Sequence, residues 1–145
     1  MMESVFADTG HWLALGSVRD SLHRAATAAM AALAGTRVVT TEMVLVEFLN
    51  DRGSRGPEAR RAALLLVQAL RTNAKVHIVP QTPELFSKAL ALYTSRPDKS
   101  CSLTDCASFV VCRELGITQA LAHDHHFEQA GLVALLRPHD ERPSL

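Results

Sequence analysis

The chain has 145 residues and a mass of 15.8 kDa, which fits a single domain over residues 1–145 and leaves no room for a second core. Hydrophobic residues make up 48% and charged residues 21%, and 15 basic side chains balance 15 acidic ones, which excludes a disordered chain, a coiled coil and a basic surface over the whole molecule. No run reaches the roughly 18 apolar residues of a membrane span and MMESVFADTGHW lacks the pattern of a secretory leader, so we expect a cytoplasmic protein without membrane contact.

Strand and helix patterns alternate along the chain. Short apolar runs predict strands, and longer stretches that open with an N-cap or a proline and close with a glycine or polar residues predict helices. In order, we expect a strand over 4–9, a helix over 18–35, a strand over 37–41, helices over 41–50 and 57–73 joined by a loop over 51–57, a strand over 75–80, helices over 82–96 and 102–116, a strand over 117–124 and a short final element over 131–138. This order predicts an α/β fold with a mostly parallel sheet flanked by helices.

Four acidic residues stand where such a fold gathers its ligands, beyond the carboxyl ends of the strands. Asp8 and Asp124 each follow an apolar run that reads as a strand, and Asp105 lies in the first turn of a helix. Glu47 is embedded among apolar neighbours in VLVEFL, on a helix that starts just after a strand. The four side chains are therefore predicted to converge on one edge of the sheet.

Each acid also has a purely structural interpretation. Asp105 completes the capping pattern S-x-x-D, and Asp8 and Asp124 fit Asx-type turns in loops. A buried Glu47 would need a cation or metal as partner, or the side chain would have to face solvent. Clustered carboxylates raise one another's pKa, and hard divalent cations such as Mg²⁺ or Mn²⁺ relieve that repulsion. Such a site hydrolyses phosphodiesters without a nucleophilic side chain.

Four blocks of the sequence resemble the PIN-domain family, especially the VapC-like ribonuclease toxins of toxin-antitoxin modules. The blocks are VFADTGHWLAL, TTEMVLVEFLN, SLTDCASFVVCRELGI and ALAHDHHFEQAG, and they span nearly the whole chain in the family's order. The resemblance implies an α/β/α sandwich and an acidic Mg²⁺ or Mn²⁺ site that cuts RNA. It places that site at Asp8, Glu47, Asp105 and Asp124.

The resemblance also implies individual roles. Asp8 and Asp105 are expected to contact metal, Glu47 to bind the ion or order its water, and Asp124 to complete the pocket. Thr9 and Thr104 are expected to support these ligands or contact phosphate. The family often has an acidic residue where His126 stands, which favours one well-held ion and leaves His126 as a phosphate contact.

The remaining histidines and the cysteines give no second site. We interpret the histidines of LAHDHHF as neighbours of Asp124 and not as a metal site, and we expect His125 and His126 in a loop. His123 and His125 would project on the same side only if the segment were extended, and Asp124 would then project on the opposite side. His11 is expected to be partly exposed beside Trp12. Trp12 and Phe109 read as core side chains, and so do Cys106 and Cys112, because the three cysteines lack C-x-x-C spacing.

Other functions remain open at this level. Five arginines between residues 52 and 71 could form a local basic face for RNA or a merely solvated helix surface. A toxin would have a VapB-like antitoxin that inserts arginine or lysine into the acidic pocket, and would form a homodimer, for which the alanine-rich helix at 25–34 is a candidate interface. The alternatives are an RNA-processing nuclease outside any toxin pair and a catalytically silent module that binds RNA or a partner.

Overall fold

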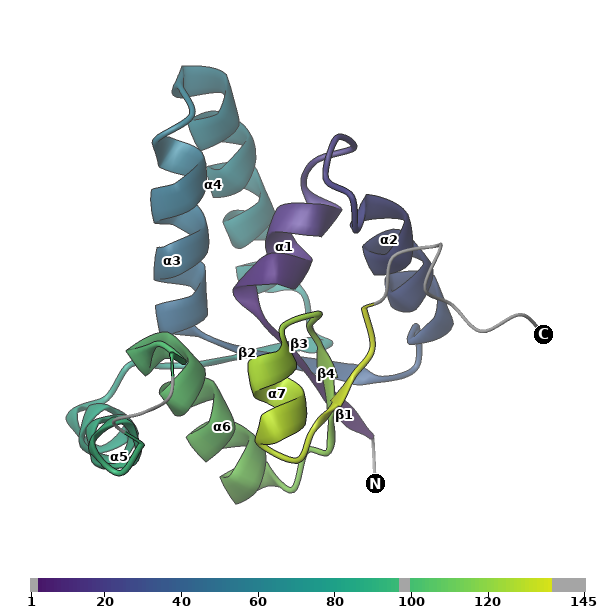
Figure 1. Cartoon of the computed structure of the whole chain (residues 1–145). Coiled ribbons are helices and arrows are strands. Elements are labelled where there is room, and N and C mark those ends of the chain that lie inside the picture. The colour runs from purple at the N-terminus through teal and green to yellow at the C-terminus, as the bar shows by residue number, and fades with distance from the viewer. Residues whose placement is uncertain (1–2, 97–99, 137–145) are drawn as a thin grey trace.

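The computed structural model describes residues 3–96 and 100–136, whose strands form one parallel sheet (Figure 1). The strands are β1 (Ser4–Ala7), β2 (Arg37–Thr41), β3 (Val76–Val79), β4 (Gln119–Leu121) and β5 (Val133–Ala134). They lie in the order β3-β2-β1-β4-β5, and every neighbouring pair is parallel. Parallel strands need long crossover connections, which explains why helices separate them in the sequence.

Helices connect the strands and cover the sheet. They are α1 (Thr9–Leu15), α2 (His23–Ala32), α3 (Glu42–Gly53), α4 (Pro57–Thr72), α5 (Pro83–Thr94), α6 (Leu103–Leu115) and α7 (His125–Gln129). In Figure 1, α1 to α4 lie above the strands, with α3 and α4 as an antiparallel pair, and α5 and α6 lie below. The predicted α/β/α arrangement around a parallel sheet is confirmed.

The strand order reverses between β1 and β4. The chain runs outward from β1 through β2 to β3, and then returns to the other side of β1 for β4 and β5. The last residues of these central strands, Ala7 and Leu121, are paired, and the backbone N–H of Asp8 donates to the carbonyl oxygen of Leu121 at 3.2 Å. In open parallel sheets this switch point is where ligands bind, so the residues that follow β1 and β4 flank the natural binding crevice.

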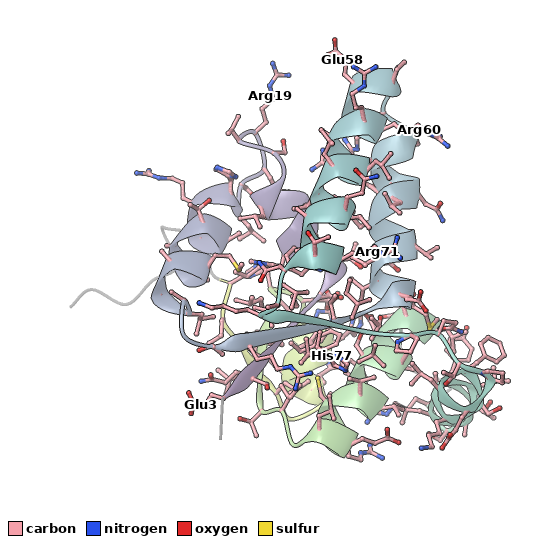
Figure 2. All side chains as sticks on the ribbon, turned by 180° about the vertical axis from the view of Figure 1, so that it is seen from behind. Glu3, Arg19, Glu58, Arg60, Arg71 and His77 are labelled. Atoms are coloured by element: carbon pink, nitrogen blue, oxygen red, sulfur yellow. The ribbon has the colours of Figure 1, made fainter. Side chains whose placement is uncertain are left out.

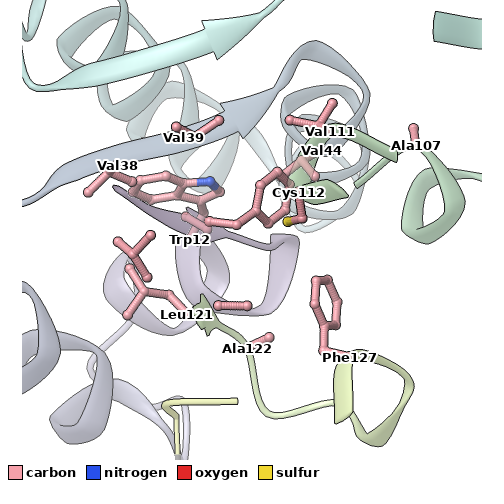
Figure 3. Close-up of a cluster of buried hydrophobic side chains, with 14 of the residues drawn as sticks. Trp12, Val38, Val39, Val44, Ala107, Val111, Cys112, Leu121, Ala122 and Phe127 are labelled. Atoms are coloured by element: carbon pink, nitrogen blue, oxygen red, sulfur yellow. The ribbon is translucent and has the colours of Figure 1, made fainter. Parts of the chain in front are cut away.

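Large apolar side chains fill the space between the sheet and the helices (Figure 3). Phe127 is fully buried, and its ring contacts that of Phe109 at 5.1 Å between centroids. Trp12 is also fully buried; its Nε1–H donates to the hydroxyl of Thr40 at 3.2 Å, and that hydroxyl donates to the carbonyl of Ala7 at 2.9 Å. This chain of bonds ties α1 to β2 and β1 and fixes where the backbone leaves β1. The predicted core positions of Trp12 and Phe109 are confirmed, as are those of Cys106 and Cys112.

Several element boundaries differ from those predicted. The helix expected from residue 18 begins at His23, because the Asp20 carboxylate accepts the Leu22 N–H at 2.8 Å and closes a turn first. α3 continues to Gly53 and shortens the predicted loop to residues 54–56, where Gly56 has a φ of 112°. The strand expected over 117–124 covers only Gln119–Leu121, and residues 137–138 of the final element lie outside the described residues.

No helix in residues 3–96 and 100–136 combines the length and apolar character needed to cross a membrane.

The predicted basic stretch does not form one patch in the structure. The Arg52 guanidinium donates to the carbonyl of Leu13 at 2.8 Å, and Arg55 pairs with Asp51 at 3.2 Å. Figure 2 shows Arg60 near the end of α4 that projects from the molecule and Arg71 at the end beside the sheet. These arginines serve local contacts or lie far apart, which favours a solvated helix surface.

Candidate active site

A cleft of about 370 Å³ opens at the switch point and brings all four predicted acids together. Asp8 comes from the end of β1, Asp124 from the segment after β4, Glu47 from α3 and Asp105 from the first turn of α6. The remaining lining residues are mostly small or polar: Thr9, Gly10, Leu13, Leu22, Ser100, Ser102, His123 and His126. The convergence predicted from strand ends is therefore what the fold produces.

Asp8 is the most deeply buried of the four acids. Its exposed fraction is 8%, and its Oδ1 has no hydrogen-bond partner among the described residues. Burial raises the pKa of Asp8 to about 7, with further upward contributions from Asp105, Glu47 and Asp124, and the backbone N–H of Thr9 opposes the rise. A buried carboxylate oxygen without a donor is costly, so this position favours a bound cation or a protonated carboxyl group.

Asp105 combines a structural role with a place in the cleft. The Ser102 hydroxyl accepts the Asp105 N–H at 3.0 Å, and Asp105 Oδ2 accepts the Ser102 N–H at 3.3 Å, which is a complete capping box. Burial raises the pKa of Asp105, and Asp124 and Glu47 raise it further. The capping interpretation is correct, and it fixes the carboxylate at the edge of the cleft.

Glu47 reaches the cleft because of the way α3 begins. The Thr41 hydroxyl accepts the Val44 N–H at 3.0 Å and sets the first turn, and Val44, Leu45 and Phe48 then face the core. Glu47 is left half-buried at the border of that face, where it lines the cleft. Its charge raises the pKa of both Asp8 and Asp105, so the Glu47 carboxylate lies within their electrostatic reach.

Asp124 and His126 form the fourth side of the cleft. Asp124 is the N-cap of α7, and its Oδ1 accepts the backbone N–H of His126 at 2.9 Å, as an Asx-type turn requires. The Nδ1 of His126 lies 2.9 Å from Asp124 Oδ1 and 3.7 Å from Asp105 Oδ2, and its Nε2 bonds the Ser100 hydroxyl at 2.9 Å. His126 is thus held between two of the acids.

The predicted loop position of His125 and His126 is wrong. The Asp124 cap and the buried Phe127 start a short helix, which brings the two imidazole rings to 4.3 Å between centroids. Ligand atoms of Asp124, His125 and His126 consequently lie within 4.8 Å of one another, a grouping that could hold a metal ion. His123 instead bonds the carbonyl of Leu136 through Nδ1 at 2.8 Å, which gives that histidine a structural role.

His11 is fully buried, so the prediction of a partly exposed side chain is also wrong. Its ring packs edge-on against Trp12 at 4.9 Å between centroids, as the neighbouring position suggested. Burial lowers the pKa of His11 to about 4, and neither ring nitrogen has a partner among the described residues. His11 does not line the cleft.

Thr9 and Thr104 have different positions. Thr9 is buried, lines the cleft, and has a hydroxyl with no hydrogen-bond partner in the described part of the chain. Thr104 lines a neighbouring hollow on the other side of Glu47. Ser100 lines the cleft and contacts His126, which the sequence reasoning missed because a serine upstream of a capping box has no distinguishing pattern.

The residues of the cleft fit a hard divalent cation. The four acids offer only oxygen ligands, their mutual repulsion favours a positive charge between them, and the Asp8 Oδ1 is buried without a donor. Mg²⁺ and Mn²⁺ prefer ligands of this kind.

In the described residues a parallel sheet carries four acids at its switch point, and the PIN domain model matches residues 5–132. The chain therefore belongs to the PIN-domain family, as the sequence blocks predicted.

Comparison with known proteins gives a more specific relationship. The chain is 32% identical over 133 residues to the 23S rRNA-specific endonuclease VapC20 from two strains of Mycobacterium tuberculosis, with 89% of this chain and 95% of the relative covered. It also matches the crystal structure of M. tuberculosis VapC20, described as a Sarcin-Ricin loop cleaving toxin, with a TM-score of 0.81 and 30% identity over 92% of this chain and 99% of that one. The predicted homology to VapC-like toxins is confirmed.

Proposed function

We propose that this protein is a Mg²⁺- or Mn²⁺-dependent endoribonuclease that hydrolyses RNA phosphodiester bonds in the four-carboxylate cleft. One observation carries the proposal: Asp8, Glu47, Asp105 and Asp124 line one cleft at the switch point of a PIN fold. Ribosomal RNA is the proposed substrate class, because the similar VapC20 is named as specific for 23S rRNA.

Asp8 and Asp105 are proposed to hold the ion directly, with Glu47 and Asp124 as further ligands or as acceptors for its water. A bound divalent ion supplies a Lewis acid for the phosphate and lowers the pKa of a coordinated water. Asp8 must give up its proton to serve as a ligand, and its raised pKa means that ion binding and proton release are coupled near neutral pH.

The neighbouring polar side chains are proposed to orient the acids and the substrate. Thr9 presents a buried hydroxyl to the cleft, and the capping box holds Asp105 in place. His126 bonds Ser100 and lies beside Asp105 and Asp124. At this position a protonated imidazole would donate a hydrogen bond to a phosphate oxygen, and a neutral one could accept a hydrogen bond. Thr104 lies farther along the same edge and is proposed to contact the RNA beyond Glu47.

We further propose that the protein is the toxin of a type II toxin-antitoxin pair and acts in the cytoplasm. A VapB-like antitoxin would silence the cleft by placing an arginine or lysine against its carboxylates, because an open acidic pocket favours a cation. Induction of the chain should stop bacterial growth, and co-expression of the product of an adjacent small gene should restore it. Growth that continues during active RNA cleavage would favour an RNA-processing nuclease outside any toxin pair.

A homodimer is part of the same proposal. The alanine-rich helix considered for the interface buries Ala25 and Ala26 within the chain, so only its outer side is free for a partner. The side chains of Phe86, Leu90 and Tyr93 lie on one face of α5 and are 41%, 44% and 50% exposed, which gives a second apolar surface for association. Light scattering on the purified chain, with Leu90→Glu as the disrupting variant, tests the oligomeric state.

Cleavage of a mixed RNA pool that includes ribosomal RNA tests the nuclease. Wild type, Asp8→Asn and Asp105→Asn are compared in Mg²⁺, Mn²⁺ and EDTA, with Glu58→Gln as a control that removes an exposed carboxylate at the start of α4, outside the cleft. Metal-dependent cutting by wild type and Glu58→Gln, lost in the other two variants, supports the proposal. A folded wild type that binds RNA without cutting it in any metal would favour the silent module.

A further inference from the structure

A second hollow adjoins the acidic cleft across Glu47. It has a volume of about 400 Å³, and Glu47 lines both spaces, so the two form neighbouring parts of one surface depression. One wall is a single face of α3, and the others are the segment after β3 and the first turn of α6. The lining residues are Glu42, Met43, Val46, Glu47, Asn50, Gln81 and Thr104.

The hollow and the cleft share one edge of the sheet. α3 begins directly after β2, and Gln81 lies two residues beyond the end of β3, so the hollow stands past the carboxyl ends of these strands as the cleft stands past those of β1 and β4. The Glu42 Oε1 accepts the backbone N–H of Gln81 at 2.6 Å, which ties two walls together. A strand of RNA whose phosphate lies in the cleft can therefore continue along the edge into the hollow.

The chemistry of the hollow suits a nucleobase better than a phosphate. Met43 and Val46 supply apolar surface, and Val46, which lines the hollow, is 55% exposed. The amides of Asn50 and Gln81 offer paired donors and acceptors of the kind that recognise base edges. Glu42 and Glu47 repel a phosphate, and an apolar surface bordered by a few polar groups is the usual composition of a small-molecule site.

We propose that this hollow is the subsite for an unstacked base next to the scissile phosphate, with Met43 and Val46 against its face and Asn50 and Gln81 at its edge. Sequence-specific recognition of RNA generally takes such splayed bases. The subsite rests on the proposed ribonuclease function, and it adds the residues that decide which nucleotide flanks the cut.

The test compares short RNA substrates that carry one mapped cleavage site, with the base present or removed at each flanking nucleotide. In wild type, removal of one flanking base should lower kcat/KM about tenfold. In Asn50→Ala and in Gln81→Ala this penalty should fall to about threefold, because each variant loses one hydrogen-bonding side chain and keeps the other amide and the apolar surface. Rates on the abasic substrate should stay within about twofold, because the reacting groups are untouched. Gln68→Ala, an identical change on an exposed part of α4, should behave as wild type.

A second readout separates failure of the subsite from failure of the nuclease. The side-chain NH₂ signals of Asn50 and Gln81, assigned by their loss in the two alanine variants, should shift when the intact oligonucleotide is added in EDTA but not with its abasic form. Equal abasic penalties in wild type and variants, or shifts limited to the acidic cleft, would overturn the subsite even if the RNA is cut. Variants that weaken antitoxin binding without changing either readout would assign the hollow to a protein partner instead.

Discussion

Replacement of Asp8 by asparagine should stabilise the metal-free protein while it removes activity. The wild-type carboxyl is buried, and its pKa lies at about 7 in the folded protein against 3.8 for the unfolded chain. Between these values the unfolded state releases the proton and the folded state keeps it, so the unfolded state is favoured increasingly as pH rises. The asparagine side chain has nearly the same shape and no charge, so the Asp8→Asn variant would escape this loss.

The magnitude follows from the two pKa values. One pKa unit corresponds to about 1.4 kcal/mol, so the rise from 3.8 to about 7 costs the wild type about 4 kcal/mol of unfolding free energy once the pH exceeds the folded-state value. At about pH 5 only about 2 kcal/mol of that has been lost. The stability advantage of Asp8→Asn should therefore grow by about 2 to 3 kcal/mol between about pH 5 and about pH 8.

Urea unfolding in EDTA at both pH values measures this difference. Titrating groups that do not interact with Asp8, including His11, are shared by wild type and variant and cancel from the comparison. Glu58→Gln, which removes an exposed carboxylate outside the cleft, is the control for the loss of one negative charge. A constant difference for Asp8→Asn would refute a desolvated Asp8 and with it the electrostatic account of the cleft. Added Mn²⁺ should reverse the order, because only the wild type gains stability by binding the ion.

Three further changes test the supporting structure. His11→Leu should gain up to about 3 kcal/mol relative to wild type as pH falls from 6.5 to about 4, because over this range the unfolded wild type protonates His11 and the folded protein, whose His11 pKa is lowered to about 4, does not. A pH-independent difference in urea unfolding would contradict the burial of His11. Ser102→Ala should lower the unfolding free energy by about 1 kcal/mol through loss of the helix cap, and an unchanged urea midpoint would mean that the capping box carries no stability. Gly116→Ala should cost about 1 kcal/mol because φ is 68° there, whereas Gly35→Ala, also with open space around its Cβ, should cost nothing; equal thermal shifts in the two variants would argue against backbone strain as the cause.

The placement of Asp8 and Asp124 on one edge was predictable, because parallel strands end at the same edge of the sheet. The two acids meet there because β1 and β4 are neighbours in the sheet, which was not predicted from the sequence. Asp105 was harder to interpret, since the S-x-x-D pattern describes a capping box completely and says nothing of a second role. In the fold the capped end of α6 lies beside the switch point, so the Asp105 carboxylate both completes the capping box and lines the cleft.

The histidines could not be placed from the sequence because their surroundings are tertiary. Asp124 caps a short helix that is anchored in the core by the buried Phe127. This helix places His126 in the cleft, where it bonds Ser100, a residue far from it in the sequence. His11 is buried because α1 packs against both α2 and α3. Neither arrangement leaves a periodic signal in a stretch of five to seven residues.

The most direct test of the proposed metal-dependent nuclease activity is the single-turnover rate of cleavage at one mapped site in an RNA substrate, measured as a function of Mn²⁺ concentration for wild type and Asp8→Asn. If the Asp8 carboxylate holds the ion, the rate should saturate with Mn²⁺ in wild type, vanish in EDTA, and fall by at least about a hundredfold in Asp8→Asn at every Mn²⁺ concentration, as expected when a group that acts in the transition state is lost. Equal rates for the two proteins at saturating Mn²⁺, or full wild-type cleavage in EDTA, would contradict this role.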